Sequence, residues 1–223
     1  MHFDSGTGQA RGVRANVLPR VDRSDAGVVV VGSVYAGTPA RQRTLAEATL
    51  ADVERGPLPD GLLAVSCFRS GDGETVLAYA QWTDEAAHRA YAATSGPEAG
   101  GVDLRSAVRY RLDRSTASGG GSPGCLITAT FDVDGPGRQR HITDALLECS
   151  ARLGGLPGAV SAHFHHSLDG SRVLNYAEWT DLAAHDAAVA AADLDELYRI
   201  STETPGVRPT RGRHYLLHAA LAR

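Results

Sequence analysis

The chain is short of cysteine, of excess positive charge and of long apolar runs, and each shortage argues against a class of protein. Its three cysteines, Cys67, Cys125 and Cys149, are an odd number without metal-ligand spacing. This pattern speaks against a disulfide framework or a thiolate zinc site and favours a reducing, cytoplasmic setting. The formal net charge is -4 at pH 7 with no cluster of Lys or Arg, so nucleic acid is not an expected partner.

Hydrophobic residues never run long enough for a membrane helix. No segment reaches the roughly 18 uninterrupted apolar residues that such a helix needs, and the charged N-terminal stretch lacks the apolar core of a signal peptide. We therefore expect neither a membrane partner nor export. Of the 223 residues, 43% are hydrophobic and 22% are charged, a balance typical of globular proteins with one large or two small domains.

An internal repeat favours two domains. The segment from Ser70 to His88 recurs from Ser167 to His185, a shift of 97 positions (179 − 82, from the two tryptophans). The residues that are identical after the shift are Ser70, Asp72, Gly73, Val76, Leu77, Tyr79, Ala80, Trp82, Thr83, Asp84, Ala86, Ala87 and His88. The chain is therefore an internal duplication.

Hydrophobic periodicity and helix-start signals predict the same order of elements in both halves. In the first half we expect a buried strand at 27–35, a helix at 38–55 capped by Thr38, a hairpin of 62–69 and 75–82, a helix capped by Thr83, and a strand at 102–112. In the second half we expect a strand at 125–133, a helix with an apolar stripe from Ile142 to Leu153, a hairpin over 159–179, a helix from Asp181 capped by Thr180, and a strand near 213–217.

These elements predict the domain plan and the fold class. Residues 1–26 are polar and aperiodic and are expected to form a flexible arm, followed by one domain at 27–113, a Gly/Ser-rich linker at 114–123 and a second domain at 124–223. The order βαββαβ is that of ferredoxin-like α+β folds, which carry both helices on one face of an antiparallel sheet. We expect the two bare sheet faces to pack together as a closed α+β barrel within one chain.

The second hairpin places an amide on an apolar face. With Asp169-Gly170 as a type I′ turn, Phe164 lies opposite Asn175 and Val160 opposite Trp179. Alternation puts Asn175 and Trp179 on one face with Val173 and Ala177, and puts Leu174, Tyr176 and Glu178 on the other. A buried amide without a partner costs about 1–3 kcal/mol, so Asn175 should have a structural partner or a ligand.

Tryptophan and histidine allow a structural reading as well as a functional one. Trp82 and Trp179 occur in both repeats, which is typical of core packing at a strand end, and His88 and His185 are equally consistent with packing or capping. Histidine side chains titrate near neutral pH, so His185 is also a candidate acid or base. Alternation splits the run from His163 to His166 between two faces with no carboxylate at ligand spacing, so we expect no metal.

The segment from Pro157 to Gly170, continuing through Asn175-Tyr176-Ala177-Glu178-Trp179, resembles the antibiotic biosynthesis monooxygenase family. The recurring pattern of that family is Pro-Gly-Phe, then Ser-x-Asp-Gly-Thr, then Asn-Tyr-Ala-Gln-Trp. Its members are dimeric α+β barrels of ferredoxin-like protomers. The resemblance implies that this tandem chain forms such a barrel as an intrachain pseudo-dimer, with further homo-oligomerisation left open.

The resemblance also implies a set of site residues. In the family's quinone-forming members an Asn and a Trp spaced four apart line a pocket between sheet and helices, which implies Asn175 and Trp179 here. Those members use a Tyr six residues after the Trp, where this chain has His185, and an Arg twenty residues after it, where Arg199 stands. The first half carries Ala78, Trp82, His88 and Val102 at these places, so only the second half retains the set.

The activity that the resemblance implies is oxygenation in aromatic polyketide tailoring. A polycyclic phenol or anthrone-type substrate would be oxidised by O2 to a quinone without a tightly bound cofactor. His185 would be the base, Asn175 and Arg199 would stabilise the enolate and peroxide oxygens, and Trp179 would form a pocket wall. We expect Phe164, Val160 and Tyr176 to bind the substrate.

Two alternatives stay open. One is hydroxylation or ring cleavage of a polycyclic aromatic polyketide with reduced flavin, which would diffuse from a partner flavin reductase because the chain shows no Gly-rich dinucleotide loop. The other is a non-oxidative polyketide cyclase or an aromatic-binding barrel. In each case the expected ligand is a small aromatic polyketide.

Overall fold

The computed structural model describes residues 12–94, 100–117, 120–210 and 212–223. The first half contains β2 (Val28–Tyr35), α1 (Pro39–Glu54), β3 (Leu62–Ser70), β4 (Thr75–Trp82), α2 (Glu85–Ala92) and β5 (Val108–Ala117). The second half contains β6 (Cys125–Val133), α3 (Gly135–Arg152), β7 (Ala159–Ser167), β8 (Arg172–Trp179), α4 (Leu182–Ala191) and β10 (Arg213–Ala222). The sequence did not predict β1 (Val13–Ala15), α5 (Asp195–Glu203) or β9 (Val207–Pro209).

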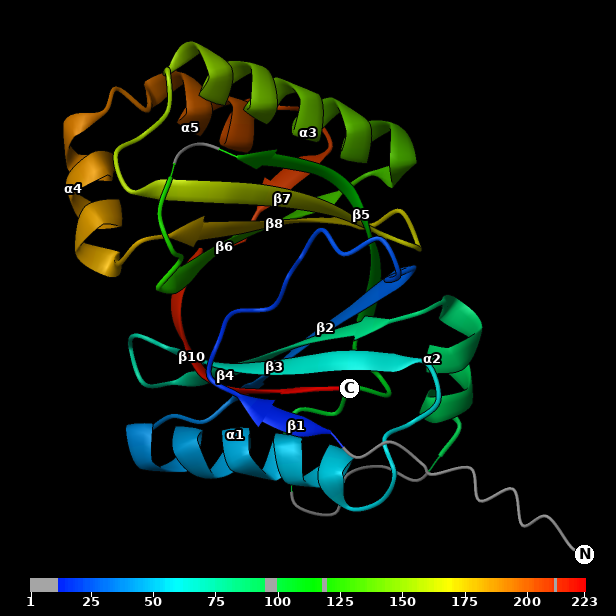
Figure 1. Cartoon of the computed structure of the whole chain (residues 1–223). Coiled ribbons are helices and arrows are strands. Elements are labelled where there is room, and N and C mark those ends of the chain that lie inside the picture. Colours follow the sequence, from blue (N-terminus) through cyan, green and yellow to red (C-terminus); the bar gives the residue numbers. More distant parts are fainter. Residues whose placement is uncertain (1–11, 95–99, 118–119, 211) are drawn as a thin grey trace, which may run out of the picture.

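The strands form one antiparallel sheet that closes into a barrel. Their order is β1-β10-β3-β4-β2-β5-β7-β8-β6-β9, and an additional pairing of β10 with β6 completes the ring, leaving β1 and β9 outside it. Helices pack on the outside only, with α1 and α2 against one half and α3, α4 and α5 against the other (Figure 1). The predicted fold class, two ferredoxin-like units forming an α+β barrel within one chain, is confirmed.

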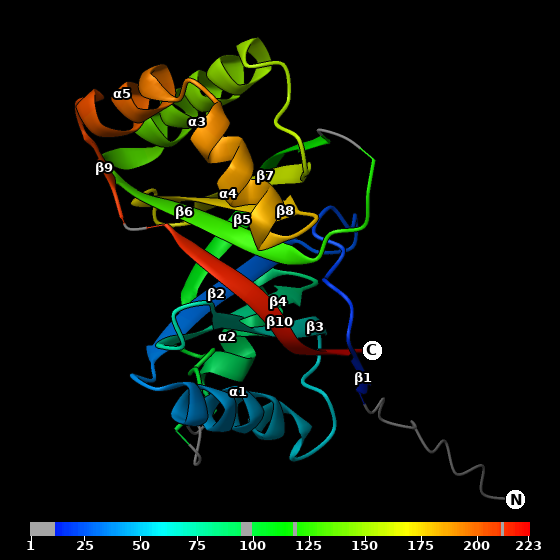
Figure 2. The same cartoon turned by 90° about the vertical axis from the view of Figure 1, so that its left-hand side faces the viewer.

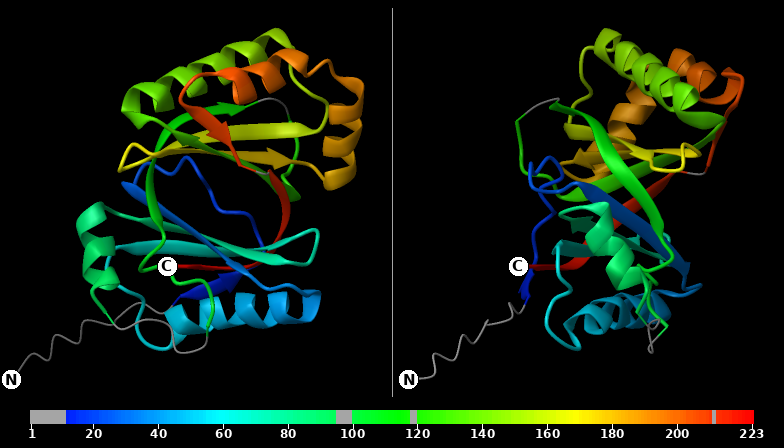
Figure 3. Two further views of the ribbon diagram at one scale, coloured as in Figure 1. Left: turned by 180° about the vertical axis from the view of Figure 1, so that it is seen from behind. Right: turned by 90° about the vertical axis from the view of Figure 1, so that its right-hand side faces the viewer.

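The last strand of each half crosses to the other half. β5 pairs with β2 over Val29–Val31 and continues along β7 to Ala117. β10 pairs with β6 over Arg213–Tyr215 and continues along β3. Figure 2 shows β10 running diagonally between the halves, and Figure 3 shows the same crossing from behind. The two sheets are therefore joined edge to edge by backbone hydrogen bonds as well as packed face to face.

The inside of the barrel is filled by aromatic and aliphatic side chains that alternate along the strands. Tyr176 lies at its centre, with its ring centroid 6.2 Å from that of Phe68 and 5.1 Å from that of Tyr79. The buried members of this inner core are Val21, Val29, Val31, Phe68, Leu77, Tyr79, Tyr110, Leu126, Leu174, Tyr176 and Tyr215.

The expected flexible arm at 1–26 is wrong for the part that the structure describes, which begins at residue 12. β1 pairs with β10 at the edge of the sheet, and Val21 is buried in the inner core. Arg14 fixes β1 to α1 through ion pairs at 2.7 Å to Glu54 and 2.9 Å to Glu47. These contacts order a segment whose composition alone gives no sign of structure. Residues 1–11 lie outside the described residues.

The strand expected at 102–112 begins later and ends later than predicted. β5 starts at Val108 and runs to Ala117, so the first residues of the expected linker at 114–123 are strand. The stretch before it is a loop that fills the outer core of the first half with Val102 and Leu104. It is fastened by a hydrogen bond from the Val102 amide to Thr49 Oγ1 at 2.8 Å.

Two local details also differ from expectation. The helix caps are Asp84 and Asp181 rather than Thr83 and Thr180. Each Asp side chain accepts a hydrogen bond from the backbone N–H of the residue three positions later. The second hairpin turn is not type I′, because Gly170 has a positive φ of 79° but Asp169 does not. Asp169 instead accepts hydrogen bonds from Ser167 Oγ and from Ser171.

We predict that His165 makes the protein less stable in acid. His165 is fully buried, its Nδ1–H donates to the His163 carbonyl and its Nε2 accepts from the Tyr79 hydroxyl. Burial lowers the pKa of His165 to about 3. Between about pH 6.5 and pH 3 the unfolded chain therefore binds a proton here that the folded chain does not, which lowers stability by up to about 1.4 kcal/mol per pH unit as pH falls.

Urea unfolding at a series of pH values tests this. His165→Phe should reduce the slope of unfolding free energy against pH in that window, whatever its effect at pH 7. Tyr79→Phe is the matched control, because it removes the hydrogen bond but leaves His165 buried, and should keep the slope. Equal slopes in wild type and His165→Phe would contradict the prediction.

Candidate active site

A cavity of about 590 Å³ lies in the second half, on the outer face of the sheet and under α3, α4 and α5. Most of its wall is apolar, and a few polar side chains, including Asn175 and His185, enter it. The large apolar residues of the wall are Ile127, Leu147, Leu153, Leu156, Phe164, Trp179, Val189, Leu194 and Leu197. Such a lining suits a flat, mainly apolar ligand held in orientation by few polar contacts.

Asn175 brings an incompletely satisfied amide to this cavity. It lies on β8 between Phe164 on β7 and Ala129 on β6, as its register partners. Its Oδ1 atom is buried and has no hydrogen-bond partner among the described residues. A buried polar atom without a partner costs about 1–3 kcal/mol. A ligand hydroxyl in the cavity would remove this cost, which is the behaviour expected of a binding residue.

His185 lies beside Trp179 at the edge of the cavity. Its ring meets the indole edge to face, with centroids 4.9 Å apart and an angle of 87° between the planes. Its Nδ1 is 3.0 Å from Asp186 Oδ1. When the neutral ring donates its Nδ1 proton to this carboxylate, the lone pair is on Nε2, so the contact sets up the tautomer that a general base needs.

In the described residues of the first half, aromatic and aliphatic side chains pack into the space that corresponds to the cavity. Tyr91 stands where the second half has Ala188 after the shift of 97 positions, and its ring lies 5.2 Å from that of Trp82. Val102 and Leu104 complete one continuous buried cluster there. In the second half the outer core is divided into two clusters, one around Phe164 and one around Trp179. The cavity lies where they would otherwise meet.

Four of the predicted site residues are brought together at the cavity: Phe164, Asn175, Trp179 and His185. The predicted pairing of Phe164 with Asn175 is confirmed.

Three predicted site residues lie elsewhere. Val160 does not line the cavity, because a bulge between Ala159 and Ser161 puts Ala159 opposite Trp179 in its place. Tyr176 points into the barrel, where alternation also placed it, and belongs to the inner core. Arg199 is exposed on α5, whose Leu197 reaches the cavity instead.

Sequence reasoning missed three residues near the cavity. The exchange of Tyr91 for Ala188 was visible in the repeat and could have indicated which half is open. Asp186 and His214 gave no such signal. His214 is on β10, and only the closure of the barrel brings its ring to 4.8 Å from that of His185.

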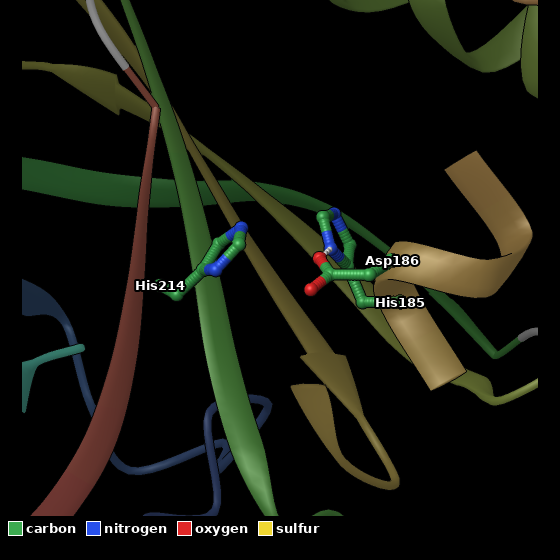
Figure 4. A group of neighbouring side chains, drawn as sticks. All are labelled: His185, Asp186 and His214. Carbon is green, nitrogen blue, oxygen red and sulfur yellow. Dashed lines mark hydrogen bonds and ion pairs between the residues drawn. The ribbon is translucent and has the colours of Figure 1, made fainter. Parts of the chain in front are cut away.

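In the histidine run, His163 and His165 point into the barrel, where their rings meet those of Tyr176 and Tyr79, while His166 bonds Thr143 on the outside at 2.9 Å. A different group has the composition of a metal site. Donor atoms of His185, Asp186 and His214 all lie within 4.8 Å of one another (Figure 4).

A second cavity, of about 710 Å³, opens at one mouth of the barrel. Its arginines are already ion-paired, Arg213 with Asp72 at 2.6 Å and Arg172 with Asp132 at 3.2 Å. It contains no histidine and no amide side chain. The cavity beside Asn175 is therefore the better candidate for chemistry.

Comparisons with known proteins support the fold. No known family's sequence profile matches the chain. The tetracenomycin-F1 monooxygenase of Streptomyces glaucescens is 47% identical over 45 residues, which is 20% of this chain and 40% of that enzyme's length. The solved structure of an anthrone oxidase-like protein superposes with a TM-score of 0.71 at 18% identity, covering 88% of this chain and 93% of that one.

A further solved structure, from Fusobacterium nucleatum, superposes with a TM-score of 0.56 at 8% identity and covers 90% of this chain and 96% of its own. These structures share the fold of this chain. The chain therefore has the fold of these structures and, over 45 residues, a sequence similar to that of a tetracenomycin-F1 monooxygenase. It contains two ferredoxin-like units in tandem, and the cavity beside Asn175 lies in the second of them. None of the helices in the described ranges has the length and apolarity that crossing a bilayer requires.

We predict that Ala188→Tyr closes the cavity. The new ring would lie against Trp179 as Tyr91 lies against Trp82 in the first half. A planar ligand such as 1,8-dihydroxyanthraquinone should bind wild type and quench its tryptophan fluorescence, and the variant should bind at least tenfold more weakly while circular dichroism shows that it is folded. The control Tyr91→Ala should cost about 2–5 kcal/mol of stability and leave ligand binding intact. Equal binding by wild type and Ala188→Tyr would contradict the assignment.

The two tryptophans should respond differently to the same substitution. Trp82 is fully buried between His88 and Tyr91, so Trp82→Phe should lower stability and leave turnover within a few-fold. Trp179 lines the cavity, so Trp179→Phe should lower turnover with a smaller effect on stability. Thermal melts and rate assays on both variants compare the two roles. The same loss of turnover from each would refute the asymmetry.

Proposed function

We propose that this chain is an oxygenase of aromatic polyketide tailoring, which oxidises a polycyclic phenol or anthrone-type substrate with O2 to a quinone without a tightly bound cofactor. The observation that carries the proposal is the buried, unpartnered Asn175 Oδ1 atom in an apolar cavity beside the His185–Asp186 pair. The named activities of the similar proteins, a tetracenomycin-F1 monooxygenase and an anthrone oxidase-like protein, support the same class of substrate.

The residues of the cavity suit the first step, removal of a proton from the substrate. His185 Nε2 takes a proton from an activated ring carbon or phenol, and Asp186 stabilises the imidazolium that results. The Asn175 amide donates a hydrogen bond through Nδ2 to the enolate oxygen, while its Oδ1 accepts from a neighbouring phenol. Trp179 and Phe164 stack on the flat ring system or contact its edge, and they exclude water from it.

The substrate supplies the electrons in this scheme. Its carbanion passes one electron to O2, the two radicals combine as a peroxide at the same carbon, and loss of water leaves a carbonyl group. One CH2 group and one O2 thus give one C=O and one H2O, so no external reductant is needed.

Arg199 has no part in this proposal because it is exposed on α5. We propose that the enzyme works in a reducing cytoplasm, in keeping with its three free, buried cysteines.

Oxygen uptake tests the source of the electrons. We expect the purified, flavin-free protein to consume one O2 per 1,8-dihydroxyanthrone above the rate of spontaneous oxidation, with quinone absorbance rising in step. Asn175→Ala should lower this rate by about 10²–10³ if the amide acts as an oxyanion donor, and by less if solvent enters the cavity. Ala78→Gly, at the corresponding place in the first half, is the matched control and should retain the rate.

Two other outcomes would replace the proposal. Activity that is absent until a flavin reductase, reduced nicotinamide and flavin are added, and that then scales with the reductase, would indicate the reduced-flavin class. Conversion of the substrate at equal rates under air and under nitrogen would indicate a non-oxidative cyclase. Binding without conversion would indicate an aromatic-binding barrel.

A further inference from the structure

Three potential metal ligands meet at the rim of the cavity, from two segments far apart in the sequence. His185 and Asp186 come from α4 and His214 from β10, and Figure 4 shows the three side chains facing a common space. Each offers one donor atom, and these atoms lie within 4.8 Å of one another. Both histidines are partly buried, whereas Asp186 is exposed, with 65% of its side chain accessible.

This arrangement is close to that of a three-ligand transition-metal site. Zinc binds imidazole nitrogen and carboxylate oxygen at about 2.0–2.2 Å, and sites with three protein ligands leave one position open. Donors around such an ion are closer together than 4.8 Å, so the group must contract on binding. The exposed Asp186 carboxylate can swing to do this, while contact with Trp179 holds the His185 ring in place.

The duplicated fold does not by itself bring such ligands together, because the equivalent positions of the first half hold a different set of side chains. Tyr110 pairs with Val29 as Tyr215 pairs with Leu126, so the position equivalent to His214 is Arg109. The shift of 97 positions makes His88 and Arg89 the equivalents of His185 and Asp186.

Those first-half residues cannot hold a cation. His88 bonds the Leu104 carbonyl through Nε2 at 2.9 Å and is buried. Both arginines pair with Glu85, at 2.7 Å from Arg89 and 3.4 Å from Arg109. Two guanidinium groups stand where the second half has a carboxylate and an imidazole. Among the described residues, this set of ligands therefore occurs beside the cavity of the second half and not at the equivalent place in the first.

We propose that His185, Asp186 and His214 bind a divalent transition-metal cation of the zinc class at the rim of the cavity. Two imidazoles and one carboxylate favour zinc, cobalt, nickel or copper over magnesium or calcium, which prefer oxygen donors. The bound cation inhibits the oxygenase, a consequence that rests on the proposed function. Coordination through Nε2 uses the lone pair of the base, and coordination through Nδ1 leaves the proton on Nε2. Either way His185 can no longer accept a proton.

Calorimetric titration of the tag-free, chelator-treated chain with ZnCl2 tests the site directly. We expect one zinc ion per chain, with at least tenfold weaker binding by His214→Ala and by Asp186→Asn. Cobalt should give a visible absorption band in wild type that zinc displaces. The control is His218→Ala on the same strand, whose Nε2 contacts Glu47 at 2.6 Å away from the group, and which should bind zinc like wild type. Melting temperatures establish that each variant is folded.

The outcomes separate this proposal from the proposed function. No zinc binding by wild type, or binding that survives His214→Ala and Asp186→Asn in folded protein, overturns the site. Zinc should inhibit oxygen uptake by wild type, and His214→Ala should lose at least tenfold in zinc sensitivity relative to its own zinc-free rate. Stoichiometric binding without inhibition would uphold the site and overturn the role of His185 as base. Absence of oxygen uptake in every condition would overturn the proposed function and leave the binding result standing.

Discussion

The barrel depends on the backbone hydrogen bonds that β5 and β10 make with both halves. An uncovered strand edge exposes unpaired N–H and C=O groups and invites pairing with another chain. β5 covers one junction, between β2 and β7, and β10 covers the other, between β3 and β6. With both junctions closed, the inner sheet face can bury its tyrosines, and helices are needed only on the outside. Because the two halves are covalently linked, each of these strand pairings forms within one chain.

The duplication allows the two halves to differ in how tightly their outer layers are packed. Tyr91, Val102 and Leu104 make the outer layer of the first half a continuous apolar core, which favours stability. The second half has the small Ala188 at the position of Tyr91, and its outer layer is divided between two clusters. Cavities reduce burial and cost stability, so a chain with one packed half and one open half keeps a binding site on a well-supported scaffold.

Much of the candidate site could be predicted from the sequence, because its parts follow from local chain geometry. Successive residues of a strand alternate faces, which puts Asn175 and Trp179 together and puts Tyr176 on the other side. The turn after Ser167 fixes the register that sets Phe164 opposite Asn175, even though its backbone type was wrongly predicted. These relations involve neighbours in one hairpin and need no knowledge of the rest of the chain.

The duplication, the βαββαβ order shared by the two halves and the face of each hairpin residue follow from the sequence. The folded chain is needed to see which strands pair across the halves, that residues 13–15 join the sheet, that Arg199 stays outside the cavity and that His214 reaches His185. The physical reason is the range of the interactions. Alternation is imposed on every strand by bond geometry, whereas the partner of a strand edge depends on which other edges remain free once the whole chain has folded.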